Sequence, residues 1–333
     1  MSSPDSRFRL AASQVLEERA TQITVFAKGV LDVTEPSAAE DLWLASRRLR
    51  AALEVFRPCL GRSEYREGRS EARRISRAVG ERRDIDVAIA AYESIREETA
   101  QEEAEGLDRV ISKLRRDQAK ANRELGQVVH GRRLQAFRIR IEEIADSTAE
   151  ADAADRAEEY RPVVTLPGEA ASLVSKRLAR LRGEATESLE ADGVEAQHRM
   201  RVAAERLRYS LELTGDALGT QAHTARRAAR GLQEVLGEIR DCDLSVPPAR
   251  EMTGELEQED VSTIVDRARG NRDLDPVLVQ AAPNRNAYRG LELAVIHLTA
   301  RRQMLYERFK RLWLEQSRQG VWVALETSLK VES

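Results

Sequence analysis

An arginine-rich segment with one histidine is the clearest candidate for chemistry in this sequence. The stretch Gln197–Gly219 reads QHRMRVAAERLRYSLELTGDALG. On an α-helix each residue advances by about 100°, so side chains three, four and seven residues apart share a face. That spacing groups the following side chains: His198, Arg201, Glu205, Arg208 and Glu212. A guanidinium group offers a planar fork of donors that suits phosphate oxygens, so the chemistry indicated is binding of an anion.

This segment has a second copy earlier in the chain. Ser46–Gly61 aligns without a gap with Ala204–Gly219, at an offset of 158 residues (219 minus 61). The identical residues include Arg48/Arg206, Arg50/Arg208, Leu53/Leu211, Glu54/Glu212 and Leu60/Leu218. The chain is therefore predicted to be a duplicated helical unit, and its function is expected where the two copies face each other.

A second pair of segments supports the duplication. VGERRDIDV at Val79–Val87 matches LGEIRDCDL at Leu236–Leu244, at an offset of 157 residues (244 minus 87). A weaker match pairs Gly106 with Gly290, at an offset of 184 residues (290 minus 106). The larger offset indicates an insertion of 27 residues (184 minus 157), which we expect at 245–285. That region is rich in acids and turn formers, including Pro247, Pro248, Pro276 and Pro283.

The composition favours long helices and excludes a uniformly basic nucleic-acid-binding surface. Charged residues make up 33% of the chain and aromatic residues 4%, and the net charge is −3. The charge is segregated, because residues 47–83 contain twelve arginines and five acids, whereas residues 142–159 contain eight acids and one arginine. No apolar stretch has the length of a signal region or a membrane span, so a cytoplasmic protein is predicted.

Hydrophobic spacing predicts the same order of long helices in each half. In the first half, the first helix covers 8–31, and the second follows the break at Glu35–Ser37 and runs to about Leu60. The third covers 64–96, and the fourth covers 104–145 with a break near Gly131. In the second half they cover 169–190, 195–218, 221–244 and 287–330. Antiparallel helices with short connections form bundles, so the fold class is all-α. The acidic residues 146–168, which contain two prolines, are predicted to link a first half at 1–145 to a second half at 169–333.

Comparable stripes of charge occur on three further predicted helices. On the first copy of the motif, one face groups Glu40, Trp43, Arg47, Arg50 and Glu54. On the third helix of each half, the corresponding groups are Arg74, Arg77, Glu81 and Asp84, and Arg227, Arg230, Glu234 and Asp241. If all stripes face one groove, the guanidinium groups converge there. The alternative is a solvated helix face, on which arginines pair with acids one turn away.

Other candidate chemistry is weaker. The D-x-D pairs Asp84/Asp86 and Asp241/Asp243 could chelate a metal, but residues i and i+2 point about 200° apart on a helix. One carboxylate of each pair is therefore expected to bridge a neighbouring arginine. The sequence has no Gly-rich phosphate loop, HExxH, CxxC, G-x-S-x-G or E-x-E-x-K motif, so no catalysis, metal or cofactor is expected. Cys59 and Cys242 align with small or apolar residues and are predicted to be core thiols.

The two arginine motifs together resemble the CHAD family, the histidine-containing α-helical domain. Its second motif is approximately H-x-x-R-x-x-x-K-x-x-R-Y-x-x-E, and here His198, Arg201, Glu205, Arg208, Tyr209 and Glu212 stand in those places. Its first motif is approximately H-D-x-R-V-x-x-R-R-x-R-x-x-L, which Glu40–Arg50 occupies, and an L-G-x-x-R-D-x-D segment follows each motif. The resemblance covers about residues 8–330. It departs where Glu40 replaces a histidine, Trp43 an arginine and Glu205 a lysine.

The resemblance implies one CHAD domain made of two four-helix bundles related by a pseudo-twofold axis. It also implies a basic central channel that holds inorganic polyphosphate, in a non-enzymatic protein at cytoplasmic polyphosphate granules, with no specific nucleic-acid or membrane partner. Combined with the arginine stripes, it predicts these polyphosphate-binding residues: Arg47, Arg48, Arg50, Arg74, Arg77, Arg83, His198, Arg201, Arg206, Arg208, Arg227, Arg230 and Arg240.

Three alternatives remain open at this point. A helical scaffold on the same fold, binding a protein or a second copy, is favoured by the three motif departures and the acidic net charge. Nonspecific attraction to nucleic-acid phosphates ranks below polyphosphate binding. A metal-dependent phosphohydrolase would use the two D-x-D pairs.

Overall fold

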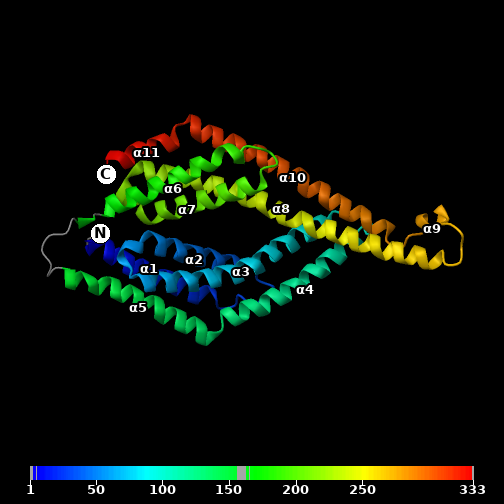
Figure 1. Cartoon of the computed structure of the whole chain (residues 1–333), viewed down its shortest axis with the longest axis horizontal. Helices are drawn as coiled ribbons and strands as arrows, with labels where there is room; N and C mark the ends of the chain where they lie inside the picture. The colour runs from blue at the N-terminus through cyan, green and yellow to red at the C-terminus, as the bar shows by residue number, and fades with distance from the viewer. Residues whose placement is uncertain (1–2, 5, 156–162, 165, 332–333) are drawn as a thin grey trace. The chain divides into compact units, whose positions relative to one another are not determined.

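The computed structural model describes residues 3–4, 6–155, 163–164 and 166–331, and nearly all of them are helical (Figure 1). The first half contains α1 (Ser6–Phe26), α2 (Pro36–Val55), the 3-10 turn η1 (Arg57–Cys59), α3 (Arg62–Glu97), α4 (Glu105–Val128) and α5 (Gly131–Asp155). The second half contains α6 (Leu166–Ser188), α7 (Val194–Leu218), α8 (Thr220–Arg267), α9 (Pro276–Gln280), α10 (Arg285–Arg318) and α11 (Val321–Val331). Two short strands, β1 (Ser3–Pro4) and β2 (Val163–Val164), pair in parallel. The all-α prediction is confirmed, whereas the division into two four-helix bundles stays a prediction.

Helix α8 corrects the predicted end of the third helix in the second half. It continues from Thr220 to Arg267, with Pro247 and Pro248 inside it, instead of ending near residue 244. A proline removes one backbone donor and normally breaks a helix. Here the hydroxyl group of Tyr92 donates to the carbonyl of Ser245 at 2.5 Å, beside the prolines. The predicted insertion at 245–285 is therefore helical over its first part.

Three other boundaries also differ from the sequence prediction. Helix α1 ends at Phe26 rather than residue 31, because the chain turns at Gly29, whose φ of 83° suits glycine. Helix α5 runs to Asp155, into the predicted linker, of which residues 156–162 and 165 lie outside the described residues. The helix predicted at 287–330 is divided into α10 and α11 at Gly320, where φ is 71°. The predicted break near Gly131 is confirmed.

The chain divides into two compact units, and each takes residues from both halves. Unit 1 comprises Met1–Arg83, Ala121–Gly237 and Glu307–Ser333. Unit 2 comprises Asp84–Lys120 and Glu238–Tyr306. The predicted halves at 1–145 and 169–333 describe the repeat, whereas these units describe packing.

The core of unit 1 uses the apolar stripes that helical spacing predicts. Helix α1 packs on α2 and α5, α6 packs on α7 and α11, and α2 packs on α7. Leu42, Leu49, Leu53 and Phe56 of the predicted stripe are all buried. Cys59 is a buried free thiol, as predicted, and so is Cys242 of unit 2. The contact between α2 and α7 brings the two copies of the arginine motif together.

The core of unit 2 consists of segments of α3, α4, α8 and α10 around Tyr92, Leu107, Leu256 and Leu291. Helices α4 and α10 come close together at Gly106 and Gly290, which the sequence pairs as equivalent. Gly106 lies against Ala287 and Leu291, and Gly290 lies against Glu103 and Leu107. In both cases the contacts are the residue three positions before the opposite glycine and the residue directly after it. Such reciprocal contacts are the pattern of two elements related by a twofold axis.

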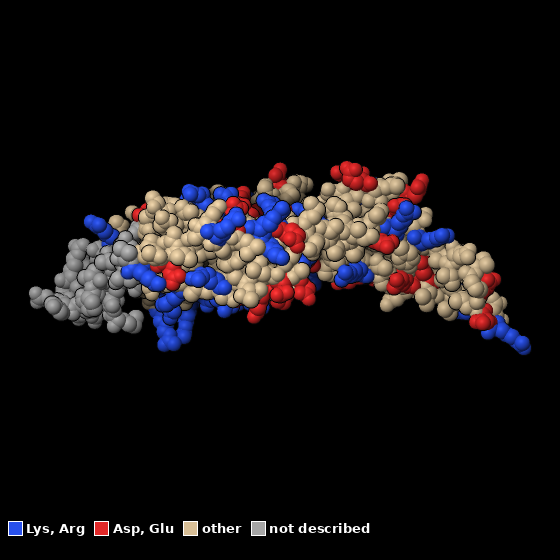
Figure 2. All heavy atoms as spheres, turned by 90° about the horizontal axis from the view of Figure 1, so that it is seen from above, with Lys and Arg blue, Asp and Glu red and all other residues tan. Residues whose placement is uncertain are grey.

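Surface charge on one face of the molecule is mixed. On the face shown in Figure 2, Lys and Arg side chains are interspersed with Asp and Glu side chains, and neither sign forms a continuous band.

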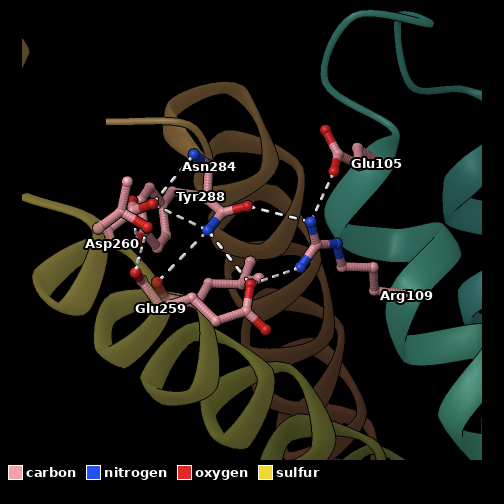
Figure 3. Close-up of polar contacts among 8 residues, drawn as sticks. Glu105, Arg109, Glu259, Asp260, Asn284 and Tyr288 are labelled. Atoms are coloured by element: carbon pink, nitrogen blue, oxygen red, sulfur yellow. Dashed lines mark hydrogen bonds and ion pairs between the residues drawn. The ribbon is translucent and has the colours of Figure 1, made fainter. Parts of the chain in front are cut away.

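A polar cluster links α4, α8 and the start of α10 within unit 2 (Figure 3). The buried carboxylate of Asp260 accepts hydrogen bonds from the Asn284 backbone and side chain, at 3.2 and 2.8 Å, and from the Tyr288 hydroxyl at 2.7 Å. Burial and the Asp260 carboxylate raise the pKa of Tyr288. Arg109 of α4 joins the cluster by donating to Glu105, Glu259 and Asn284, at 2.9, 2.9 and 3.1 Å.

Replacing Asp260 should weaken unit 2. The change Asp260→Ala leaves the amide of Asn284 and the hydroxyl of Tyr288 without their acceptor, so we expect a loss of about 2–4 kcal/mol of unfolding free energy. The measurement is urea denaturation followed by circular dichroism. The control is Asp266→Ala, which removes an exposed pair with Arg269 and should cost no more than about 0.5 kcal/mol. Equal stability of the two variants would contradict a structural role for this cluster.

Candidate functional site

A nearly buried ion pair joins the two copies of the arginine motif. Arg47 of α2 donates through Nε to Glu205 Oε1 of α7 at 2.5 Å, and its terminal nitrogen contacts the second carboxylate oxygen. The side chains are only 13% and 7% exposed. Arg201 lies 3.8 Å from the same carboxylate, and His198 is partly buried one turn earlier on α7. Arg47 and Glu205 are 158 residues apart, which is the offset between the two copies, so the copies contact each other at equivalent positions.

Two further ion pairs cross between the halves in a reciprocal manner. Arg19 of α1 lies 3.5 Å from Glu212 of α7, and Arg177 of α6 pairs with Glu54 of α2. Arg19 and Arg177 are separated by the repeat offset (177 minus 19 is 158), as are the two glutamates (212 minus 54). In each pair an arginine of one half contacts a glutamate of the other half at equivalent positions, which is again the pattern of copies related by a twofold axis. The sequence analysis missed Arg19 and Arg177, although extending the offset to the first helix of each half would have found them.

Glu212 also neutralises arginines of both motif copies. Arg48 lies 3.4 Å and Arg208 3.6 Å from its carboxylate. Arg208 also donates to the Gln233 side chain at 2.6 Å and lies 4.1 Å from the centre of the Tyr209 ring. These guanidinium groups are therefore held by glutamate, amide and aromatic contacts together.

Arg50 differs from its neighbours. It is partly buried, and among the described residues it makes no hydrogen bond or ion pair; its Nε is fully shielded from solvent. Burial lowers the pKa of Arg50; the charge of Glu54 opposes this, and the charges of Arg47 and Arg206 add to it. We define the α2–α7 arginine cluster as six arginines and three glutamates: Arg47, Arg48, Arg50, Arg201, Arg206, Arg208, Glu54, Glu205 and Glu212. These residues leave an excess of positive charge.

Glu40 and Trp43, the two residues of α2 that differ from the family motif, hold arginines in place. Arg83 of α3 donates to Glu40 at 2.8 Å. The guanidinium carbons of Arg47 and Arg83 lie 4.3 and 5.1 Å from the centre of the Trp43 ring, within the range of cation–π attraction. The indole fits against Gly80, where an added Cβ would lie 3.3 Å from Trp43 Nε1. Glu40 and Trp43 thus position two of the predicted binding residues.

The remaining predicted arginines lie elsewhere. Arg74, Arg77, Arg227 and Arg230 contact partners on their own helices: Glu71, Glu81, Thr224 and Glu234 respectively. Arg74 also lines a groove between α3 and α5. Arg240 belongs to unit 2. The contacts of Arg74, Arg77, Arg227 and Arg230 fit the solvated-face alternative, and among the described residues none of them links these four arginines to the α2–α7 arginine cluster.

The aspartate pairs have partners of other kinds. Asp243 pairs with Arg302 at 2.6 Å, which confirms the predicted bridge to an arginine for that residue. Asp86 accepts from Gln118 at 2.7 Å. Within the described ranges, no three His, Cys, Asp or Glu side chains gather in a way that could hold a metal ion. This geometry gives no support to the phosphohydrolase alternative.

Comparison with known proteins decides the family. The family model of the CHAD domain matches residues 14–246, more than half of the chain. The chain belongs to the CHAD family. CHAD proteins are known in general for binding inorganic polyphosphate. The match ends just before Pro247, so the last part of α8 and all of α9, α10 and α11 lie outside it.

Two solved structures have the same CHAD fold. The crystal structure of the CHAD domain from the plant Ricinus communis is 18% identical, with a TM-score of 0.57, over 87% of this chain and 92% of that one. PptA from Streptomyces chartreusis is 18% identical, with a TM-score of 0.53, over 94% of this chain and 100% of that one. No protein with a curated description matches. In the described part of this CHAD protein, no helix combines the length and apolar character that a membrane crossing requires.

Proposed function

We propose that this CHAD protein binds inorganic polyphosphate at the α2–α7 arginine cluster, without enzymatic action, in the cytoplasm at polyphosphate granules. The observation that supports the proposal is Arg50, a partly buried guanidinium group with no carboxylate partner among the described residues. A chain with about one negative charge per phosphate gains free energy when such arginines neutralise its phosphates, because its condensed counterions are then released into solution.

Contact distances suggest the order in which the polymer engages the arginines. Arg206 is exposed, and Arg50 has no partner to give up. Arg48 and Arg208 hold Glu212 only at 3.4 and 3.6 Å, longer than a good charged hydrogen bond. Arg47 is held tightly by Glu205. Arg50, Arg206 and Arg48 therefore form the first contacts. Arg208 joins them by giving up its hydrogen bond to Gln233, and Arg47 follows only if Glu205 is displaced.

Charge reversal at equivalent positions of the two copies tests the site. We expect Arg50→Glu with Arg208→Glu to abolish retention of long-chain polyphosphate at low salt, because both copies lose a cation. The milder pair Arg50→Gln with Arg208→Gln should reduce the slope of log affinity against log salt by about two. The measurement is binding by fluorescence anisotropy over a salt series, with circular dichroism as the check on folding.

The matched control is Arg77→Glu with Arg230→Glu, which changes the net charge equally. These two arginines are exposed and pair within their own helices, so the control should keep most of the affinity. If both double variants lose binding equally, the attraction belongs to net charge and not to this cluster. If the unaltered protein shows no retention at low salt, polyphosphate binding fails as a function.

A helical scaffold remains the second candidate, and one observation favours it. Glu205 and Glu212 already neutralise several arginines of the cluster, and the face in Figure 2 has no continuous positive band. A scaffold would keep its fold and show no retention of polyphosphate, so the same salt series separates the two functions.

A further inference from the structure

The end of α8 and the short helix α9 expose apolar side chains in unit 2, beyond the region that the CHAD model matches. Val261, Val265, Val277 and Val279 are 51 to 63% exposed. Helix α9 has no buried residue, although four of its five residues are apolar or proline. A cluster of exposed apolar side chains marks a surface that another molecule covers.

Two of these side chains, Val261 and Val279, line a groove. The groove has a volume of about 610 Å³ and is lined by Val261 and Ile264 of α8, Val279 of α9 and Tyr288 of α10. Asp260 and Tyr288 also line it, and Figure 3 shows them pointing toward each other, joined by a hydrogen bond. Because these two lining residues are already held in place, docking needs little ordering of their side chains.

Opposite charges line the same groove. Glu257 of α8 and Arg285 of α10 both contribute to its lining and are both exposed. Neither forms an ion pair with another described residue. A surface with an apolar centre, one unpaired acid and one unpaired base is self-complementary, because a twofold rotation sets the acid of each copy against the base of the other.

We propose that this groove is a self-association surface, on which a second copy of the chain docks in a twofold-symmetric dimer. Val261, Val265 and Val279 of each copy meet at the centre and exclude water. Glu257 of each copy pairs with Arg285 of the other at the rim. The occupant is a second copy rather than an unrelated protein because the rim carries both charges needed to complement itself. The proposal is independent of polyphosphate binding, since none of these residues belongs to the α2–α7 arginine cluster.

Charge-swap variants of the full chain test the pairing, with association followed by sedimentation equilibrium up to about 100 μM, a range suited to small interfaces. We expect a dimer for the unaltered protein. Glu257→Arg alone and Arg285→Glu alone should each be monomeric, since one presents only bases and the other only acids. An equimolar mixture of these two variants should restore the dimer, because every rim contact then joins opposite charges.

The apolar centre has its own variant. Val261→Asp should raise the dimer dissociation constant by about tenfold or more, whereas Val323→Asp, on the similarly exposed face of α11, should leave it unchanged. Circular dichroism confirms that each variant folds. A monomeric unaltered protein, a mixture of charge variants that stays monomeric, or a dimer that survives Val261→Asp would each overturn the proposal. A different protein bound in this groove, with no dimer, would overturn it as well.

Discussion

Glu205→Gln is expected to lower the unfolding free energy of this CHAD protein by about 3 kcal/mol, measured in the absence of polyphosphate. The carboxylate of Glu205 binds both nitrogens of the Arg47 fork, and both side chains are nearly buried. Removing one member of such a pair leaves an uncompensated charge away from water, which is costly. Arg201, at 3.8 Å from the same carboxylate, loses a partner too.

The same variant should respond more strongly to polyphosphate. A phosphate group presents oxygens that a guanidinium fork accepts as it accepts a carboxylate, so the polymer can take the place that Glu205 leaves. A ligand that binds only the folded state raises the melting temperature, and at a fixed ligand concentration the rise increases with the logarithm of the affinity. We therefore expect long-chain polyphosphate to raise the melting temperature of Glu205→Gln by more than it raises that of the unaltered protein.

The control for this experiment is Glu81→Gln, which breaks an exposed pair with Arg77 one turn away. It should cost no more than about 0.5 kcal/mol and leave the response to polyphosphate unchanged. A Glu205→Gln variant that is destabilised yet gains no more from polyphosphate than the unaltered protein would show that Glu205 does not compete with the polymer. Glu205 stands where the family motif has a lysine, so this result would also show whether the departure limits binding.

Helical periodicity predicted the buried faces of the helices well, because burial of one stripe is a property of each helix by itself. The stripe Leu42, Leu49 and Leu53 follows directly from spacing, and all three residues are buried. Spacing also placed Arg47 and Arg50 on a common face. It gave no information about partners, since the glutamates that hold Arg47 and Arg177 lie 158 and 123 residues away in the chain.

Helix α8 shows why local rules fail where tertiary packing is strong. Pro247 and Pro248 predict a break, but Ala249, Met252 and Leu256 beyond them are buried in the core of unit 2. Burial of that apolar stripe outweighs the missing backbone donors, and the Tyr92 hydroxyl supplies a hydrogen bond beside the prolines. A sequence rule that scores each proline alone includes neither the burial of the apolar stripe nor the hydrogen bond from Tyr92.

The close contact between α4 and α10 in unit 2 gives the second large effect. Gly290→Ala is expected to lower the unfolding free energy by about 3 kcal/mol, because an added Cβ would overlap the backbone carbonyl oxygen of Glu103. A backbone atom has no rotamer with which to move away, so α4 and α10 must separate and lose contact between Leu107 and its neighbours. Gly106→Ala should cost a similar amount, since its Cβ would overlap the carbonyl of Ala287.

Gly254→Ala is the matched control, because it lies inside α8 of the same unit with open space around the added carbon. Alanine there should raise the unfolding free energy by up to about 1 kcal/mol, since it restricts the unfolded chain and favours the helix. Hydrogen exchange locates the change: amide protection should fall in unit 2 for both crossing variants. Because Gly106 and Gly290 occupy equivalent positions in a reciprocal contact, a large effect at one glycine and none at the other would contradict the twofold character of this crossing.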